Sequence, residues 1–105
     1  MEHSIPGLSA KILVEQCLQA RLRYDYIDDP TTSTVLTSFF LFGYYGNLEK
    51  HAKARYHLHE AISFAEVVGL DDEMHLSQLG IGEAQWCRRV FWLLLITERY
   101  AVNLY

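Results

Sequence analysis

The histidines are the first residues in this sequence whose type could bind a metal ion, because histidine nitrogen is a common zinc ligand. His57 and His59 are two positions apart, and on a helix such residues point about 200° apart, so one ion cannot bind both. His51 and His59 share a helix face, but Arg55 lies between them on that face. We therefore interpret these histidines as part of a solvated or half-buried polar face.

Three consecutive acids and two cysteines are the other groups that could do chemistry. The acids at 71–73 lack the spaced oxygens and the central glycine of a calcium-binding loop, which predicts a solvated turn. Cys17 and Cys87 lie in separate apolar contexts, where cysteine is more often a core residue than a nucleophile. Phosphate-binding glycine loops, serine nucleophile elbows and paired catalytic acids are absent from the sequence. We predict no catalytic, metal or cofactor residue and no enzyme.

The composition fits one compact domain of 105 residues, with 50% hydrophobic residues. Nine basic against 13 acidic residues give a net charge of −4, and the basic residues are scattered, which excludes a nucleic-acid footprint. Two cysteines are too few for a disulfide framework or a structural zinc site. The N-terminus has no secretory signal, and the longest apolar run, 90–96, is far shorter than the roughly 20 residues that cross a membrane. We expect a soluble, intracellular chain.

Apolar periodicity between breaks at 6–7, 28–30 and 69–82 predicts helices that would position these side chains. The first helix is expected to begin at an N-cap, Ser9, and to fade near residues 24–27. Its apolar face is predicted to contain Leu13, Val14, Cys17, Leu18 and Leu22.

The second predicted helix follows Asp29, the expected N-cap, and Pro30, the expected first helical residue. Residues 31–45 are rich in β-branched and aromatic side chains that would also allow a strand. A four-residue step favours a helix, with an apolar face formed by Val35, Leu36, Phe39, Phe40 and Gly43. On this face Gly43 is expected to allow close approach of another helix.

The third predicted helix begins after Asn47, the expected N-cap, and ends at Gly69. The short break before it implies an antiparallel helical hairpin. Residues 70–83 are expected to form a loop with a helical turn at 74–79, followed by a last helix from about Glu83. One stripe of the third helix is predicted to pack, formed by Ala54, Leu58, Ala61, Ala65 and Val68, with Ile62 beside it. The predicted fold class is all-α, a single domain over 1–105 built from antiparallel helices.

The apolar run at 90–96, VFWLLLI, covers every side of a helix, because seven consecutive residues make about two turns. A helix that is apolar all round is buried all round, and three companion helices cover only part of it. We therefore expect the chain to be a fragment of a larger helical domain, or a protomer that self-associates through the helix between Val90 and Ile96.

Three stretches resemble the middle homology region of fungal zinc-cluster transcription factors, over about residues 29–105. They are TSFFLFGYY at 37–45, YHLHEAISFAEVVGL at 56–70 and RRVFWLLLITER at 88–99. The last stretch, continuing to Ala101, is most similar to the sugar-responsive regulators of maltose, starch, xylan and rhamnose use. The residues that match the signature helix of that family are Arg88, Arg89, Phe91, Trp92, Glu98 and Arg99.

The resemblance implies a larger all-helical regulatory domain behind an N-terminal zinc cluster that binds DNA. That cluster requires six cysteines in one short segment, so zinc and DNA binding would belong to a missing N-terminal domain. The implied function is a regulatory or interaction region that controls transcription of carbohydrate-utilisation genes in the nucleus. The implied partners are the remainder of the factor and a sugar inducer, and the signature residues are expected to serve folding and interdomain contacts.

Two other function classes are weighed beside this one. Ala54, Leu58 and Ala61 resemble the packing positions of a tetratricopeptide unit, which would make the chain a helical-repeat adaptor. A second copy at that period is absent from the sequence. A small ligand carrier would instead use aromatic side chains as pocket walls, with Phe39, Phe42, Tyr45 and Trp86 as the candidates.

Overall fold

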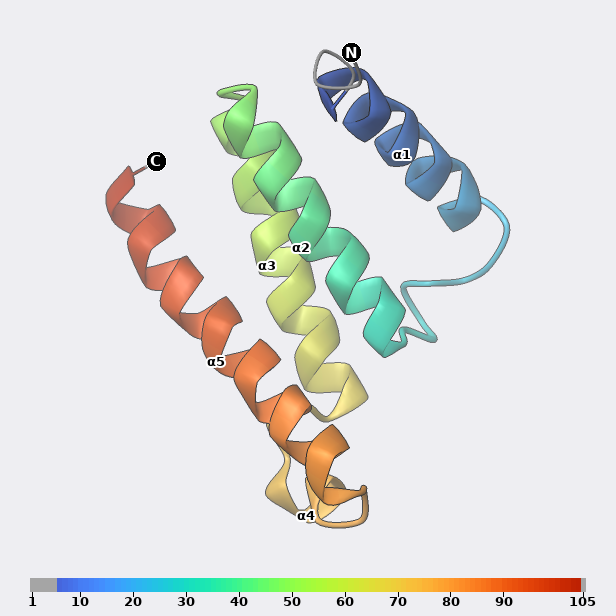
Figure 1. Cartoon of the computed structure of the whole chain (residues 1–105), viewed down its shortest axis with the longest axis vertical. Coiled ribbons are helices and arrows are strands. Elements are labelled where there is room, and N and C mark those ends of the chain that lie inside the picture. The colour runs from blue at the N-terminus through green and yellow to red at the C-terminus, as the bar shows by residue number, and fades with distance from the viewer. Residues whose placement is uncertain (1–5, 105) are drawn as a thin grey trace.

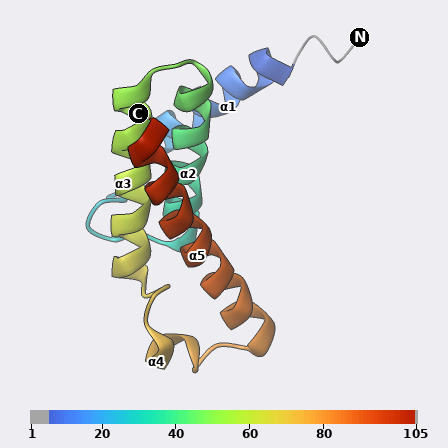
Figure 2. The same cartoon turned by 90° about the vertical axis from the view of Figure 1, so that its left-hand side faces the viewer.

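The computed structural model describes residues 6–104, with side-chain burial described for residues 10–100. All the regular structure in this range is helical, which confirms the all-α fold class. The helices are α1 (Pro6–Arg21), α2 (Thr32–Asn47), α3 (His51–Val68), α4 (Glu73–Leu76) and α5 (Ile81–Leu104). Figure 1 shows α2 and α3 side by side in the middle, with α1 on one flank and α5 on the other. Figure 2, turned by 90°, shows α5 crossing in front of the α2–α3 pair and α1 running away from α2 towards its N-terminus.

The α2–α3 pair is the antiparallel hairpin that the sequence predicts. Three residues, 48–50, reverse the chain, and Glu49 adopts a left-handed φ of 59° to make the turn. The prediction that Asn47 caps α3 is wrong, because Asn47 is the last residue of α2. Lys50 occupies the N-cap position without a side-chain cap, and its backbone N–H donates to the Tyr45 carbonyl at 2.9 Å.

The packing stripe of α3 is confirmed. Ala54, Leu58, Ala61 and Ala65 are fully buried, and three of the four are small, so the α2 backbone can approach closely. Val68 is only partly buried at the edge of this stripe. The main core contains Leu58, Ala61 and Ala65 of this stripe and extends to buried side chains of α2, of the segment between α3 and α5, and of α5, namely Val35, Leu70, Leu76, Ala84, Cys87 and Leu94.

The predicted helix starts at Ser9 and Asp29 are both wrong. Thr31 is the N-cap of α2, where its hydroxyl accepts from the Thr34 backbone N–H at 3.4 Å and its own N–H donates to the Thr34 hydroxyl at 3.0 Å. This reciprocal pair is a capping box, which satisfies two backbone donors at the start of α2 and places that start after Pro30. Ser9 lies inside α1, which begins at Pro6. Proline is well tolerated at the first position of a helix, because its missing N–H would have no partner there.

The predicted apolar face of α1 is largely wrong. Val14 is buried and Cys17 is half-buried, whereas Leu13, Leu18 and Leu22 are exposed. The reason is the narrow contact of α1, which meets the hairpin mainly through Val14 and Arg21.

The predicted face of α2 is rotated from the one that packs. Val35 is buried as expected and Leu41 is buried beside it, but Leu36 and Gly43 are exposed. A Cβ at position 43 would meet nothing within 4 Å, so the close approach expected there does not occur in the part of the chain that the structure describes. The packing partner, α3, instead lies over Thr34, Val35 and Ser38, which the four-residue apolar step does not include in full.

The segment after α3 follows the prediction closely. Gly69 ends α3 in the left-handed region with φ 95°, and the backbone N–H groups of Gly69 and Leu70 both donate to the Ala65 carbonyl, at 3.0 and 2.9 Å. One short helix, α4, then forms after its N-cap Asp72; it begins one residue before the expected turn at 74–79 and ends three residues before the expected end. The last helix, α5, begins at Ile81, two residues before the expected Glu83.

Candidate interaction surface and buried polar network

The apolar run of α5 is only partly covered. Leu94 is 1% exposed, and Val90, Phe91 and Leu95 are half-buried against the core. On the outer side, Trp92 is 64%, Leu93 50% and Ile96 46% exposed. The expectation that this chain leaves part of the 90–96 run uncovered is therefore confirmed. With Gln85, Arg88 and Arg89, these three side chains line an open depression along α5, which we call the α5 outer face.

One of the two consecutive arginines in the signature helix makes a surface ion pair. The Arg88 guanidinium donates to both carboxylate oxygens of Glu73, from Nη2 at 2.7 Å and from Nε at 2.9 Å. These hydrogen bonds lower the pKa of Glu73 and raise that of Arg88. Both side chains are exposed to water, which screens the pair, so its main effect is to orient α4 against α5.

The six signature residues do not converge on one site. Phe91 packs against the core, whereas Arg89, Trp92 and Arg99 are exposed. Glu98 approaches α3, where its Oε2 lies 3.9 Å from His59 Nε2. Arg88 and Glu98 thus contact neighbouring elements, and Arg88, Phe91 and Trp92 line a small depression beside residues 70–73.

A buried polar network joins α1, α2 and α3, and sequence reasoning missed it. Arg21 donates from Nη1 to Glu60 Oε1 at 3.1 Å and from Nη2 to Ser38 Oγ at 2.6 Å and to the Thr34 carbonyl at 3.3 Å. The Ser38 hydroxyl donates to Glu60 Oε1 at 2.9 Å, and His57 Nδ1 lies 3.0 Å from the same oxygen. One carboxylate oxygen thus collects three partners.

The network changes the titration of its carboxylate. Burial raises the pKa of Glu60, but hydrogen bonds from His57, Ser38 and Arg21, together with the Arg21 charge, outweigh burial and hold that pKa below its usual range. Glu60 is therefore ionised at neutral pH, and the buried arginine has its counter-ion. The solvated or half-buried face expected for the histidines is wrong for His57, which is 9% exposed and stacks on Tyr45.

The remaining groups considered for chemistry, Cys87 and the acids at 71–73, have surroundings typical of structural residues. Burial, followed by the charge of Glu83, raises the pKa of the Cys87 thiol, which disfavours a thiolate nucleophile. The acids at 71 and 72 are exposed, as expected, and Asp72 caps α4 by accepting from the Met74 N–H at 3.0 Å. No group of three His, Cys, Asp or Glu side chains in the described part of the chain is placed to hold a metal ion.

The aromatic residues considered as pocket walls pack in separate places. Phe39 and Phe42 stack on each other with ring centroids 5.8 Å apart, and Tyr45 stacks on His57 at 5.5 Å. Trp86 lies on α5 and is 44% exposed. These side chains serve packing between helices and do not form one ligand pocket.

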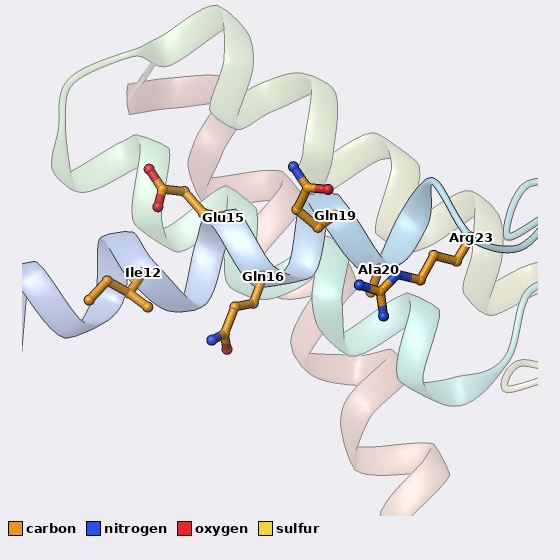
Figure 3. A pocket seen from close by; sticks show the side chains of 6 residues that line it. All are labelled: Ile12, Glu15, Gln16, Gln19, Ala20 and Arg23. Carbon is orange, nitrogen blue, oxygen red and sulfur yellow. The ribbon is translucent and has the colours of Figure 1, made fainter.

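Another depression lies on the outer side of α1. Its lining residues, shown in Figure 3, are Ile12, Glu15, Gln16, Gln19 and Ala20 of α1 and Arg23, two residues after its end. A surface made by one helix and the residues just after it has no opposing wall, so it is an uncovered helix face.

Between residues 6 and 104, none of the helices combines the length and hydropathy that crossing a bilayer requires.

Comparison with known proteins gives a consistent result. A family model described as "Fungal specific transcription factor domain" matches residues 2–105. The probable sucrose utilization protein SUC1 of Candida albicans is 34% identical over 87 residues, which are 83% of this chain and 17% of that protein. Two maltose fermentation regulatory proteins of Saccharomyces cerevisiae, MAL33 and MAL13, are 28% and 29% identical over 94 and 93 residues. Those segments are 90% and 88% of this chain and 20% of each relative.

This chain thus spans about a fifth of the length of the curated relatives that it matches. No solved structure matches it.

Proposed function

The chain belongs to the fungal-specific transcription factor domain family, as the resemblance of residues 29–105 predicts, and we propose that it is a regulatory and interaction region of a factor controlling carbohydrate-utilisation genes. The observation that carries the proposal is the family match across residues 2–105. The similarity to one sucrose utilization protein and two maltose fermentation regulatory proteins supports sugar use as the controlled process.

Within that role, the α5 outer face is the part that contacts other protein. Trp92, Leu93 and Ile96 expose apolar surface. Removing such surface from water stabilises a complex by about 25 cal/mol per Å². The remainder of the transcription factor is the partner that we propose, and self-association through the same helix is the competing arrangement. Glu98 and Arg88 would fix the angle of α5 by their contacts with α3 and α4.

DNA contact belongs to another part of the protein in this proposal. The chain carries a net charge of −4 and only two cysteines, and its described residues provide neither a basic face nor a zinc site. We place its site of action in the nucleus and assign it no cofactor, no membrane contact and no catalytic step. A sugar would act as the inducer of the complete factor.

The proposal is tested in the complete protein, in cells. Trp92→Asp combined with Leu93→Asp places charges on the α5 outer face, and Val67→Asp is the matched control on the exposed side of α3. We expect the double variant to lose the change in transcript levels that follows transfer from glucose to maltose or sucrose. The control should respond as the wild type does. Equal responses in the wild type and in a strain without the gene would contradict the regulatory function itself.

A further inference from the structure

The first helix is attached to the hairpin by a narrow set of contacts. Among its described residues, Val14 and Arg21 are the buried ones, while Leu13 and Leu18 face water. Val14 packs on an apolar cluster of the hairpin formed by Leu41, Tyr45 and Ala54. Beyond this contact α1 diverges from α2 towards its N-terminus (Figure 2). The apolar contact alone is therefore small compared with the packing between α2 and α3.

At the other end of α1, Arg21 provides the polar attachment. Its guanidinium bonds Ser38 and the Thr34 carbonyl of α2 and Glu60 of α3, so one side chain links three helices. The guanidinium also lies over the Tyr26 ring, with its carbon 4.4 Å from the ring centroid. Tyr26 in turn meets Phe64 of α3 edge to face at 5.9 Å. The polar network thus determines whether this end of α1 stays closed.

The closed arrangement leaves one buried donor unsatisfied. Arg21 Nε has no hydrogen-bond partner, although the side chain is 94% buried. A buried donor without a partner costs free energy that water would return on opening. The attachment of α1 therefore rests on a charged pair, but it leaves the Nε donor of Arg21 unsatisfied. We expect a contact with this combination to open locally.

We propose that α1 is a releasable strap, held closed by the contacts of Arg21 with Ser38 and Glu60, whose release uncovers the hairpin surface made by Leu41, Tyr45 and Ala54. The strap opens as one unit because Val14 and Arg21 lie on one continuous helix. The hairpin and α5 stay folded when it opens, since their shared core contains no residue of α1. This inference goes beyond the proposed function and does not depend on it.

Acid is the laboratory trigger for the strap. Glu60 is faced by Arg21 from α1, Ser38 from α2 and His57 from its own helix, and His57 is stacked on Tyr45, whose ring lies 4.8 Å from Lys53 Nζ. When Glu60 takes up a proton, Arg21 keeps its charge and loses its only acidic partner in the network. Acid therefore weakens the attachment of α1 at this end.

The test is amide hydrogen exchange on the purified whole chain at neutral pH. Glu60→Gln removes the charge at nearly constant volume, and Glu73→Gln is the matched control at the exposed pair with Arg88. In Glu60→Gln we expect the exchange of amides in residues 14–21 to accelerate at least about tenfold more than the exchange of amides in residues 58–65, whose acceleration reports the loss of global stability. The control should change neither segment.

Two results would overturn the proposal. One is equal acceleration in α1 and α3, which would make the network part of the general core. The other is an α1 that is unprotected in the wild type or unaffected by Glu60→Gln. If Glu60→Gln does not fold, Ser38→Ala gives the same readout, since it removes the hydroxyl between Arg21 and Glu60 and keeps both charges.

Discussion

The α2–α3 hairpin and helix α5 contain similar kinds of apolar residues and bury them very differently. In α3, buried residues recur every three or four positions and give one stripe, which α2 and α5 cover between them. In α5, seven apolar residues are consecutive, and α3 covers only the side that contains Leu94. The spacing of apolar residues, more than their number, decides whether the apolar surface of a helix is covered within the described chain or stays exposed.

The largest expected effect lies in the hairpin. Phe64→Ala removes a side chain that is 6% exposed and packs in the main core, which should reduce the free energy of unfolding by about 3–5 kcal/mol. Chemical denaturation of the wild type and the variant measures this difference. A loss below about 1 kcal/mol would show that the hairpin core tolerates cavities and would erase the contrast with α5.

The second effect concerns the polar part of the hairpin. Glu60→Gln removes the charge from a buried, hydrogen-bonded carboxylate, which should reduce the free energy of unfolding by about 1.5–3 kcal/mol at neutral pH.

The pH dependence of this effect has a definite sign. Because the folded pKa of Glu60 is lowered, its contribution is present above the unfolded pKa and is lost as the pH falls through the folded pKa. Unfolding curves at a series of acidic pH values should therefore converge for the wild type and Glu60→Gln. A difference that stays constant with pH would contradict the assignment.

A smaller effect is expected at the end of the hairpin. Gly69→Ala places a Cβ in the left-handed region and 3.2 Å from the His75 ring, so it should cost about 1–2 kcal/mol. Gly43→Ala is the control, since Gly43 is exposed in a helix and a Cβ there meets nothing within 4 Å; it should stabilise the chain by about 0.5–1 kcal/mol. Thermal unfolding compares the two variants, and effects of the same sign would contradict the prediction.

The smallest effect on stability is expected on the α5 outer face. Trp92→Ala removes a side chain that is 64% exposed and should change the free energy of unfolding by about 0.5 kcal/mol or less. The same variant should lower the apparent mass of the isolated chain in light scattering, because it removes apolar area available for self-association. A wild-type chain that is monomeric at all concentrations would show that this face does not pair with a second copy.

Local patterns predicted the parts of the fold that depend on neighbouring residues. The α3 stripe and the C-cap at Gly69 are examples. The apolar face of a helix and a glycine C-cap both depend only on residues in or next to that helix. The starts at Ser9, Asp29 and Asn47 were wrong because several residues near each break can cap a helix, and the choice depends on which donors the surrounding chain leaves unpaired.

The buried polar network could not be predicted from the sequence for a different reason. Its contacts join residues 17, 22 and 39 positions apart, as in Arg21 with Ser38, Ser38 with Glu60 and Arg21 with Glu60. The only local signal is the three-residue spacing of His57 and Glu60 on one helix face. For the six signature residues, the family resemblance identified the helix, and the structure divided them between the core and the surface.

The three-residue turn at 48–50 also bears on how the molecule is made. Because the turn is so short, the contacts of α2 with α3 are close in the sequence, and such contacts cost little loop-closure entropy and form quickly. During synthesis from the N-terminus, the hairpin can close before α5 has left the ribosome. Of the helices described, α5 is therefore made after a hairpin that can already be folded when the α5 outer face first meets water.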